Sequence, residues 1–238
     1  WALGFTASNP HLPENLRNQA RKLFTKTTTH LLKLKSPRAI AFAMTGLYHH
    51  LRTEPSVKLL KVFKNLADRQ VAQYKEFASE DWHWFEDQLT YSNSKLAESL
   101  FYAYDLTKNP EYLTVAKKTL NFLKTITFEK DHYSPIGQNG WYFRNKKRAY
   151  FDQQPEETST MVETKTVAYQ VTGDKQYLKD AYRVFSWFLG KNHLNQMVYD
   201  EATGGCYDGV GEYAINLNQG AESTISYLLA RLALDEVK

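Results

Sequence analysis

Two aspartates stand in the same local setting, 65 positions apart in the chain. Asp87 lies in Phe85-Glu86-Asp87-Gln88 and Asp152 lies in Tyr150-Phe151-Asp152-Gln153, so each has an aromatic residue shortly before it and a glutamine after it. Hydrolysis of a glycoside needs one carboxyl group as general acid and a second as base or nucleophile, in differing environments. We therefore expect these two aspartates to be the acid/base pair. The alternative is that both are helix N-caps.

Glutamates follow both aspartates at equal spacing. Glu98 comes after Asp87 at the same distance as Glu163 after Asp152, and Glu222 stands in a related setting, Asn-Gln-Gly-Ala-Glu. If the spacing holds, these glutamates lie about one turn into their helices and face one way. We expect Glu163 and Glu222 to assist the aspartates or to bind sugar hydroxyls. The alternative is that the glutamates bond to neighbouring loops.

Three long segments, 79–92, 128–154 and 191–217, are rich in Trp, Tyr and Phe. Sugar rings pack their C–H faces on aromatic planes, while carboxylates and amides bind the hydroxyl edges. We therefore expect a ligand to contact Trp82, His83, Trp84, Glu86, Trp141, Tyr142, Gln153, Tyr207, Asp208, Asn218 and Gln219. The alternative is that the aromatic residues cap the helix ends as an extension of the core. Glu86 also fits a solvated position, as do Glu156 and Glu157.

Each long segment carries one histidine: His83, His132 or His193. Imidazoles in loops suit proton transfer at a sugar carbon or metal binding. The chain contains no H-x-x-x-H or H-E-x-x-H spacing and no nucleotide-binding or G-x-S-x-G motif, so we expect no metal and no cofactor. Cys206 has no evident base beside it and is expected to be structural.

Composition narrows the class of partner. The 238 residues carry a net charge of +4, and the densest basic cluster, Lys146-Lys147-Arg148, is short, so nucleic acid is not expected. One cysteine leaves no internal disulfide. No apolar run is long enough to span a membrane, and the first residues lack the pattern of a secretory signal, so a cytoplasmic location is expected.

Helical periodicity dominates the sequence and predicts eight helices, at 13–34, 37–53, 56–78, 93–108, 110–127, 155–172, 174–190 and 218–236. Asn109 before Pro110 and Asp174 after Gly173 are suitable N-caps, and Gly173 is also a suitable C-terminal cap.

An internal repeat organises these helices. Residues 85–123 align on 150–188 without a gap, with ten identities. The identical pairs are Asp87/Asp152, Gln88/Gln153, Ser94/Ser159, Glu98/Glu163, Ala103/Ala168, Tyr104/Tyr169, Thr107/Thr172, Tyr112/Tyr177, Leu113/Leu178 and Ala116/Ala181. Helical hairpins with tight turns at one end and long aromatic loops at the other predict an all-α fold, an α/α toroid. We expect a single domain, 1–238, with units at about 85–149, 150–206 and a weaker 207–236, and an incomplete or small ring.

Three motifs carry a resemblance over roughly 80–236: Trp84-Phe85-Glu86-Asp87-Gln88, Tyr150-Phe151-Asp152-Gln153-Gln154-Pro155, and Gly204-Gly205-Cys206-Tyr207-Asp208-Gly209 followed by Asn216 to Thr224. They resemble a bacterial α/α-toroid domain of the six-hairpin glycosidase superfamily, of the kind associated with glycosyltransferases. The resemblance implies a carbohydrate ligand. Two aspartates one hairpin apart are similar to the arrangement in unsaturated glucuronyl hydrolases.

Three functions remain open from the sequence. The first is a glycoside hydrolase-like enzyme that acts on an oligosaccharide or polysaccharide. The second is a non-catalytic glycan-binding or accessory module, with a glycosyltransferase or a second subunit as its partner. The third is a sugar epimerase, in which His132 and His193 transfer protons.

Overall fold

Helices dominate the computed structural model, which describes residues 1–237. Within these residues the α-helices are α1 (Ala2–Ser8), α2 (Glu14–Thr28), α3 (Pro37–Thr53), α4 (Val57–Phe77), α5 (Asn93–Thr107), α6 (Pro110–Thr127), α7 (Pro155–Thr172), α8 (Lys175–Phe185) and α9 (Ala221–Asp235). A 3₁₀ helix, η1, covers Leu31–Lys33. The short strands are β1 (Gln88–Leu89), β2 (Tyr142–Phe143), β3 (Gly209–Val210) and β4 (Ile215–Asn216).

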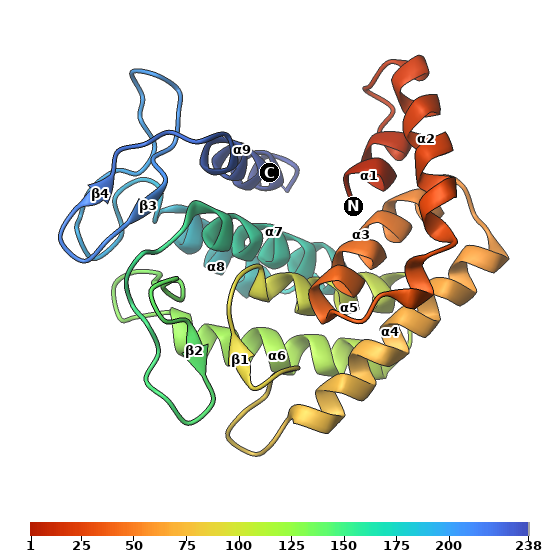
Figure 1. Ribbon diagram of the computed structural model, residues 1–238, viewed down its shortest axis with the longest axis horizontal. Helices are drawn as coiled ribbons and strands as arrows, with labels where there is room; N and C mark the ends of the chain where they lie inside the picture. Colours follow the sequence, from red (N-terminus) through yellow and green to blue (C-terminus); the bar gives the residue numbers. More distant parts are fainter. Residues whose placement is uncertain (238) are drawn as a thin grey trace.

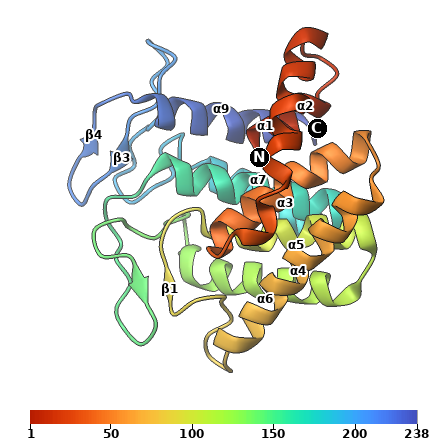
Figure 2. The same ribbon diagram turned by 45° about the vertical axis from the view of Figure 1, so that its right-hand side comes forward.

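The odd-numbered helices α1, α3, α5, α7 and α9 lie side by side in an arc, and α2, α4, α6 and α8 pack outside them (Figures 1 and 2). Helices α1, α3, α5 and α7 are each joined to the even-numbered helix that follows, so the chain forms successive helical hairpins. The predicted all-α toroid is thus confirmed. Helices α1 and α9, at the two ends of the arc, lie on either side of a cavity of about 550 Å³ that α3, α5 and α7 also line.

Most predicted helix bounds agree with the structure to within a residue or two, and α3, α6 and α7 agree in full. The helix expected over 174–190 ends at Phe185, and the helix expected over 218–236 begins at Ala221. The helix expected over 13–34 ends instead at Thr28. Three consecutive threonines, 27–29, turn their hydroxyl groups back to carbonyl oxygens in the preceding turn, which competes with continuation of the helix. Helix α1 was not predicted. It is held by tertiary contact, because a Cβ added to Gly4 would lie 2.2 Å from the carbonyl oxygen of Gly46.

The two repeat units share the chemistry of their tight turns. The hydroxyl groups of Thr107 and Thr172 each donate to a carbonyl oxygen four residues earlier, at 2.6 Å in both cases. Lys108 and Gly173 follow in the left-handed conformation that ends a helix. The side chains of Asn109 and Asp174 then cap the next helix, as the sequence predicted.

The long loops lie together at one end of the molecule and are linked by short strand pairs (Figure 1). Strand β1 pairs antiparallel with β2 in the next loop. Gln153 in that second loop pairs with Val210 in the third, and β3 pairs with β4. The first loop is therefore held by the second, and the second by the third. No helix among residues 1–237 is long and apolar enough to cross a membrane.

The first turn of α7 packs against the first turn of α5, which buries Glu157 and leaves Glu156 half-buried. The expectation that Glu156 and Glu157 are solvated is therefore wrong. Glu156 accepts a hydrogen bond from the Ser92 hydroxyl group. Glu157 Oε1 accepts from the backbone and the side-chain nitrogen of Asn93, at 3.3 and 3.0 Å. Glu157 Oε2 is buried without a hydrogen-bond partner among the described residues.

Burial and the neighbouring Glu156 raise the pKa of Glu157 to about 8. The folded protein therefore holds this proton more tightly than the unfolded chain. The resulting stabilisation is full below pH 4.5, the usual pKa, and is lost as the pH rises through about 8.

Glu157→Gln should remove this pH dependence, because glutamine stays neutral. We expect the free energy of unfolding of the variant, relative to the wild type, to rise by about 1–3 kcal/mol between pH 4.5 and pH 8. Urea unfolding followed by circular dichroism at a series of pH values measures this difference. A difference that stays constant over the range would contradict the raised pKa.

Candidate active site

A cavity of about 900 Å³ opens at the loop end of the toroid, between the loop that precedes α7, the β3–β4 hairpin and the N-terminus of α9. It brings together four residues that the sequence singled out: Asp152, Gln153, Asp208 and Glu222. Backbone from β3 and β4 and the side chains of Gln138, Asn139, Gln154, Asn216 and Ser223 complete most of the wall. Carboxylates and amides thus converge on one hollow, as a hydroxylated ligand requires.

Asp152 is held in a backbone conformation that is uncommon for a residue other than glycine. Its φ is 55°, in the left-handed region, and such conformations persist only where the surroundings impose them. Its carbonyl oxygen accepts from the backbone nitrogen of Gln138 at 3.1 Å. A Cβ added to Gly211 would lie 3.8 Å from Asp152 Oδ1, so the carboxylate lies beside the β3–β4 hairpin.

Hydrogen bonds to the backbone and the side chain of Gln153 hold the chain next to Asp152 in place. Its backbone exchanges two hydrogen bonds with Val210, at 3.0 and 2.9 Å. Its side-chain oxygen accepts from the indole nitrogen of Trp187 at 2.7 Å, and its side-chain nitrogen donates to the carbonyl oxygen of Tyr150 at 2.8 Å and to Ser134 at 3.3 Å. Gln153 is buried, so its role in this structure is to hold the wall of the cavity.

Two further carboxylates lie at the N-terminus of α9. Asp208 Oδ1 accepts from the backbone nitrogen of Gly220 at 2.8 Å and from the Ser223 hydroxyl group at 2.6 Å, so Asp208 caps this helix from a distant position in the chain. A Cβ on Gly220 would approach Asp208 Oδ1 to 2.8 Å, so a side chain there would displace the Asp208 carboxylate. Glu222 lies in the first turn, where the partial positive charge of a helix N-terminus stabilises an anion.

Asp87 is not among the described residues that line this cavity. Its side chain is 65% exposed and lies 3.5 Å from the guanidinium group of Arg144, which follows β2. The backbone nitrogen of Arg144 also donates to the Asp87 carbonyl oxygen at 2.8 Å. The structure therefore places the two repeat-equivalent aspartates in different surroundings.

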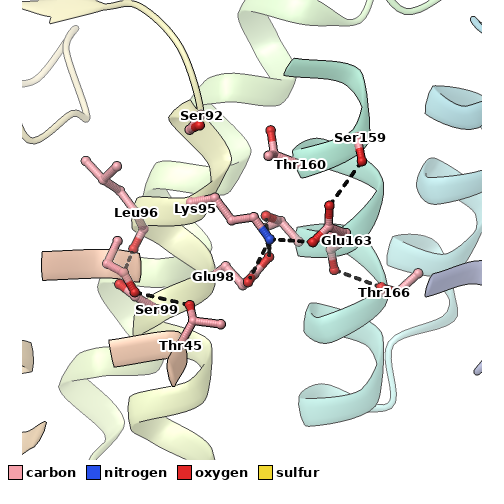
Figure 3. A network of polar contacts seen from close by, with 12 residues as sticks. Thr45, Ser92, Lys95, Leu96, Glu98, Ser99, Ser159, Thr160, Glu163 and Thr166 are labelled. Atoms are coloured by element: carbon pink, nitrogen blue, oxygen red, sulfur yellow. Dashed lines mark hydrogen bonds and ion pairs between the residues drawn. The ribbon is translucent and has the colours of Figure 1, made fainter. Parts of the chain in front are cut away.

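Glu163 lies on α7 in a buried polar network with α5 (Figure 3). The Lys95 ammonium group donates to both oxygens of Glu98, at 3.0 and 2.9 Å, and to Glu163 at 2.7 Å. Thr164 donates to Glu98, and Ser159 donates to Glu163. Glu98 and Glu163 line the 550 Å³ cavity between α1 and α9, whereas Glu222 lines the 900 Å³ cavity, so these glutamates do not share one site.

The network shifts the pKa of both partners on α5. Burial raises the pKa of the Glu98 carboxyl group, and nearby Glu163 adds to this effect while Lys95 opposes it. Burial alone would lower the pKa of Lys95, but Glu163 and Glu98 outweigh it and hold that pKa above its usual range.

The first aromatic loop is part of the core. Trp82 is 3% exposed and Trp84 is fully buried, so neither ring offers a face to a ligand in this structure. These two tryptophans extend the core, which is the alternative that the sequence left open. The indole nitrogen of Trp82 donates to the carbonyl oxygen of Glu86 at 2.7 Å. The Glu86 carboxylate pairs with Arg38. His83 is half-buried and lies edge-on to Phe122.

The remaining expected ligand contacts lie in the later loops. Trp141, Tyr142 and Tyr207 are partly exposed and pack against the core. Asn218 and Gln219 are exposed, and Gln219 donates to Asp200 at 2.8 Å. The 900 Å³ cavity includes none of these among its described lining residues.

His132 and His193 do lie near one another, in the lining of a third cavity of about 500 Å³. His193 Nε2 is 3.0 Å from the carbonyl oxygen of Gly211. Since a carbonyl can only accept, Nε2 carries the hydrogen. Residues 1–237 contain no group of three or more His, Cys, Asp or Glu side chains placed to hold a metal ion.

Cys206 is fully buried, and burial, with Asp208 nearby, raises the pKa of its thiol to about 12. A thiol in this state is protonated at neutral pH and is a poor nucleophile. We expect a disulfide reagent such as DTNB to leave the folded protein unlabelled at about pH 8 and to label one thiol per chain in denaturant. Rapid labelling of the folded protein would contradict this placement.

Comparison with known proteins agrees with this architecture. Residues 40–216 match the family described as beta-L-arabinofuranosidase, GH127 catalytic domain. No curated protein matches the chain by sequence.

Solved structures share the fold at low sequence identity. A heparin-specific unsaturated glucuronyl hydrolase has a TM-score of 0.65 and 16% identity, and the match covers 99% of this chain and 84% of that chain. A GH76 α-mannanase from Bacteroides thetaiotaomicron has a TM-score of 0.59 and 12% identity, over 85% of this chain and 52% of that chain. A sugar epimerase from a ruminal bacterium has a TM-score of 0.58 and 13% identity, over 86% of this chain and 55% of that chain.

These neighbours share the toroid, and the chain spans only about half the length of two of them. The resemblance to six-hairpin glycosidases is thereby confirmed. Because the family model matches most of the sequence, the chain belongs to the family of the beta-L-arabinofuranosidase GH127 catalytic domain, a glycoside hydrolase family.

Proposed function

We propose that this protein is a glycoside hydrolase that cleaves an oligosaccharide or polysaccharide in the 900 Å³ cavity. The observation that carries the proposal is that Asp152 and Glu222, from a loop and a helix N-terminus far apart in the sequence, line one cavity. Membership of a glycoside hydrolase family supports it. A cavity of this size accommodates more than one sugar ring.

The surroundings of the two carboxylates suggest different roles. Glu222 lies at the positive end of α9, which favours an anion, so we assign it the role of base or nucleophile. Asp152 then supplies the proton to the leaving oxygen. Asp208 is committed to capping α9 and supports the wall. Glu163 is held by Lys95 and Ser159 and supports the interior of the toroid, and Asp87 takes no part in the reaction.

A glycan-binding or accessory module is the second candidate, and a glycosyltransferase partner, a second subunit and a cytoplasmic location remain predictions. This candidate shares the cavity with the first but requires no chemistry from Asp152 and Glu222. A hydrolysis assay therefore distinguishes the enzyme from the glycan-binding module.

A sugar epimerase is less well supported. His132 and His193 line one cavity, as this function would require. However, His193 Nε2 donates to Gly211, and His193 Nδ1 is buried. Neither nitrogen of this ring is free to exchange a proton with a ligand.

The test uses substrates named after the family and the structural neighbours: an aryl β-L-arabinofuranoside, an aryl α-mannoside and an unsaturated uronyl disaccharide. We expect at least one to be hydrolysed. Asp152→Asn and Glu222→Gln should each lower kcat by about 10²–10⁴-fold, the usual contribution of a general acid or base.

Two variants serve as comparisons. Asp87→Asn should leave kcat within about threefold of the wild type, because the carboxylate lies outside the cavity. If Asp87→Asn lowers kcat as much as Asp152→Asn does, the two aspartates are the acid/base pair that the sequence predicted. Glu80→Gln changes an exposed carboxylate in the first loop and controls for a general effect of charge. Hydrolysis that survives in both cavity variants would refute the assignment of these residues.

A further inference from the structure

Positive charge is concentrated in one part of the chain. Residues 14–77, which contain α2, η1, α3 and α4, carry 13 Lys or Arg against 4 Asp or Glu, a net charge of +9. The whole chain carries only +4, so the rest of it carries −5. Such an asymmetry indicates that the basic part faces an acidic partner.

Seven lysines in this part are exposed, and no ion pair joins any of them to another residue within 1–237. The acids of the same part do not neutralise them, because Glu54 pairs with Arg21 and Asp68 accepts a hydrogen bond from the Tyr112 hydroxyl group. The seven are Lys22 and Lys26 on α2, Lys33 and Lys35 in and after η1, and Lys58, Lys61 and Lys64 on α4.

Exposed apolar side chains accompany these lysines. Val57 is 76% exposed, and Leu16, Leu23 and Leu32 are between 43% and 51% exposed. Three of the four directly adjoin one of the seven lysines in the chain, in the pairs Lys22-Leu23, Leu32-Lys33 and Val57-Lys58. Apolar and basic groups therefore alternate on this surface, instead of forming an apolar centre with a charged rim as in a typical protein interface.

The elements that carry these side chains lie on one side of the molecule. Helix α2 leads into η1, and the Arg69 guanidinium group on α4 donates to the carbonyl oxygens of Leu32, at 3.2 Å, and Leu34. Figures 1 and 2 show α2 and α4 on the side opposite β3 and β4. A partner bound to α2, η1 and α4 therefore leaves the 900 Å³ cavity accessible, because that cavity opens beside β3 and β4.

We propose that the basic face, formed by the exposed side chains of α2, η1 and α4, docks the protein on an anionic phospholipid membrane. The lysine ammonium groups attract the lipid phosphates, and the leucines and Val57 enter the boundary between headgroups and acyl chains. A soluble polyanion such as nucleic acid or an acidic polysaccharide would satisfy the lysines but offer no apolar region to the leucines. The contact is peripheral and does not depend on the proposed hydrolase reaction.

Vesicle binding tests the proposal directly. The protein should sediment with vesicles of phosphatidylcholine that contain about 30 mol% phosphatidylglycerol, and bind them at least about tenfold more tightly than vesicles of phosphatidylcholine alone. Raising the salt concentration from about 0.1 M to about 0.5 M should weaken binding about tenfold, because salt screens the attraction between lysines and phosphates.

Two double variants test the two kinds of side chain. Lys22→Glu with Lys26→Glu should weaken binding to the anionic vesicles at least about tenfold, since two attractive charges become repulsive. Leu23→Ser with Val57→Ser should weaken it about tenfold through the loss of apolar burial, and should leave binding to heparin and duplex DNA unchanged.

Matched controls are available in the same chain. Lys117→Glu with Lys118→Glu changes two exposed lysines on α6, and Leu217→Ser changes a leucine that is 70% exposed after β4. Both should bind vesicles as the wild type does. Thermal unfolding of each variant checks that the fold is intact.

Equal binding to neutral and anionic vesicles, or binding to neither, would overturn the proposal. So would vesicle binding that is unchanged by Leu23→Ser with Val57→Ser, because the basic face would then be a site for soluble polyanions. Hydrolysis of a soluble substrate should be the same in all of these variants. The docking proposal and the hydrolase proposal can therefore fail separately.

Discussion

The arrangement of the inner helices depends on one buried cation. The Lys95 side chain is 2% exposed and meets Glu98 on its own helix and Glu163 on α7 (Figure 3). A buried charge is tolerated only where opposite charge and hydrogen bonds satisfy it, and removing one partner leaves the others uncompensated. The observed register of α5 against α7 brings these three groups together, and a shifted register would leave buried charges unpaired. The same contact lies in the middle of the arc, where α3 packs against α5 and α9 packs against α7.

The packing of α5 against α7 also determines how the long loops are arranged. With α5 and α7 fixed side by side, their first turns meet, and Glu156 and Glu157 are enclosed against Ser92 and Asn93. The loops that enter these helices are then close enough to pair with one another through short strands. Glu98 and Glu163, the partners of Lys95, line the cavity between α1 and α9, while the entering loops and the start of α9 form the cavity lined by Asp152 and Glu222. Glu98 and Glu163 are thus in a different cavity from Asp152 and Glu222.

The sequence predicted the helices and the toroid well because both follow from local periodicity and from a repeat with capping residues at fixed positions. It predicted the candidate site less well, because side-chain environment depends on contacts between loops. Nothing local marks Trp84 as fully buried, since an aromatic residue in a loop suits a core and a binding surface equally. Glu157 was expected in water because acids are common in the first turn of a helix. Its burial results from packing against α5, which periodicity does not report.

The two repeat units show how one sequence pattern gives two chemical settings. Gln88 and Gln153 are equivalent, and each pairs with the following loop, but their partners differ. Gln88 pairs with Phe143 in β2, which brings Arg144 to Asp87 and leaves that aspartate exposed. Gln153 pairs with Val210 and is bound by Trp187, and Asp152 before it has a left-handed backbone. Asp152 is exposed like Asp87, but it lines the 900 Å³ cavity. A strained backbone imposed by its surroundings is a common feature of functional sites. In the proposed function the second copy therefore carries the chemistry, and Asp152 is paired with Glu222 from the last helix, which lines the same cavity, instead of with the repeat-equivalent aspartate.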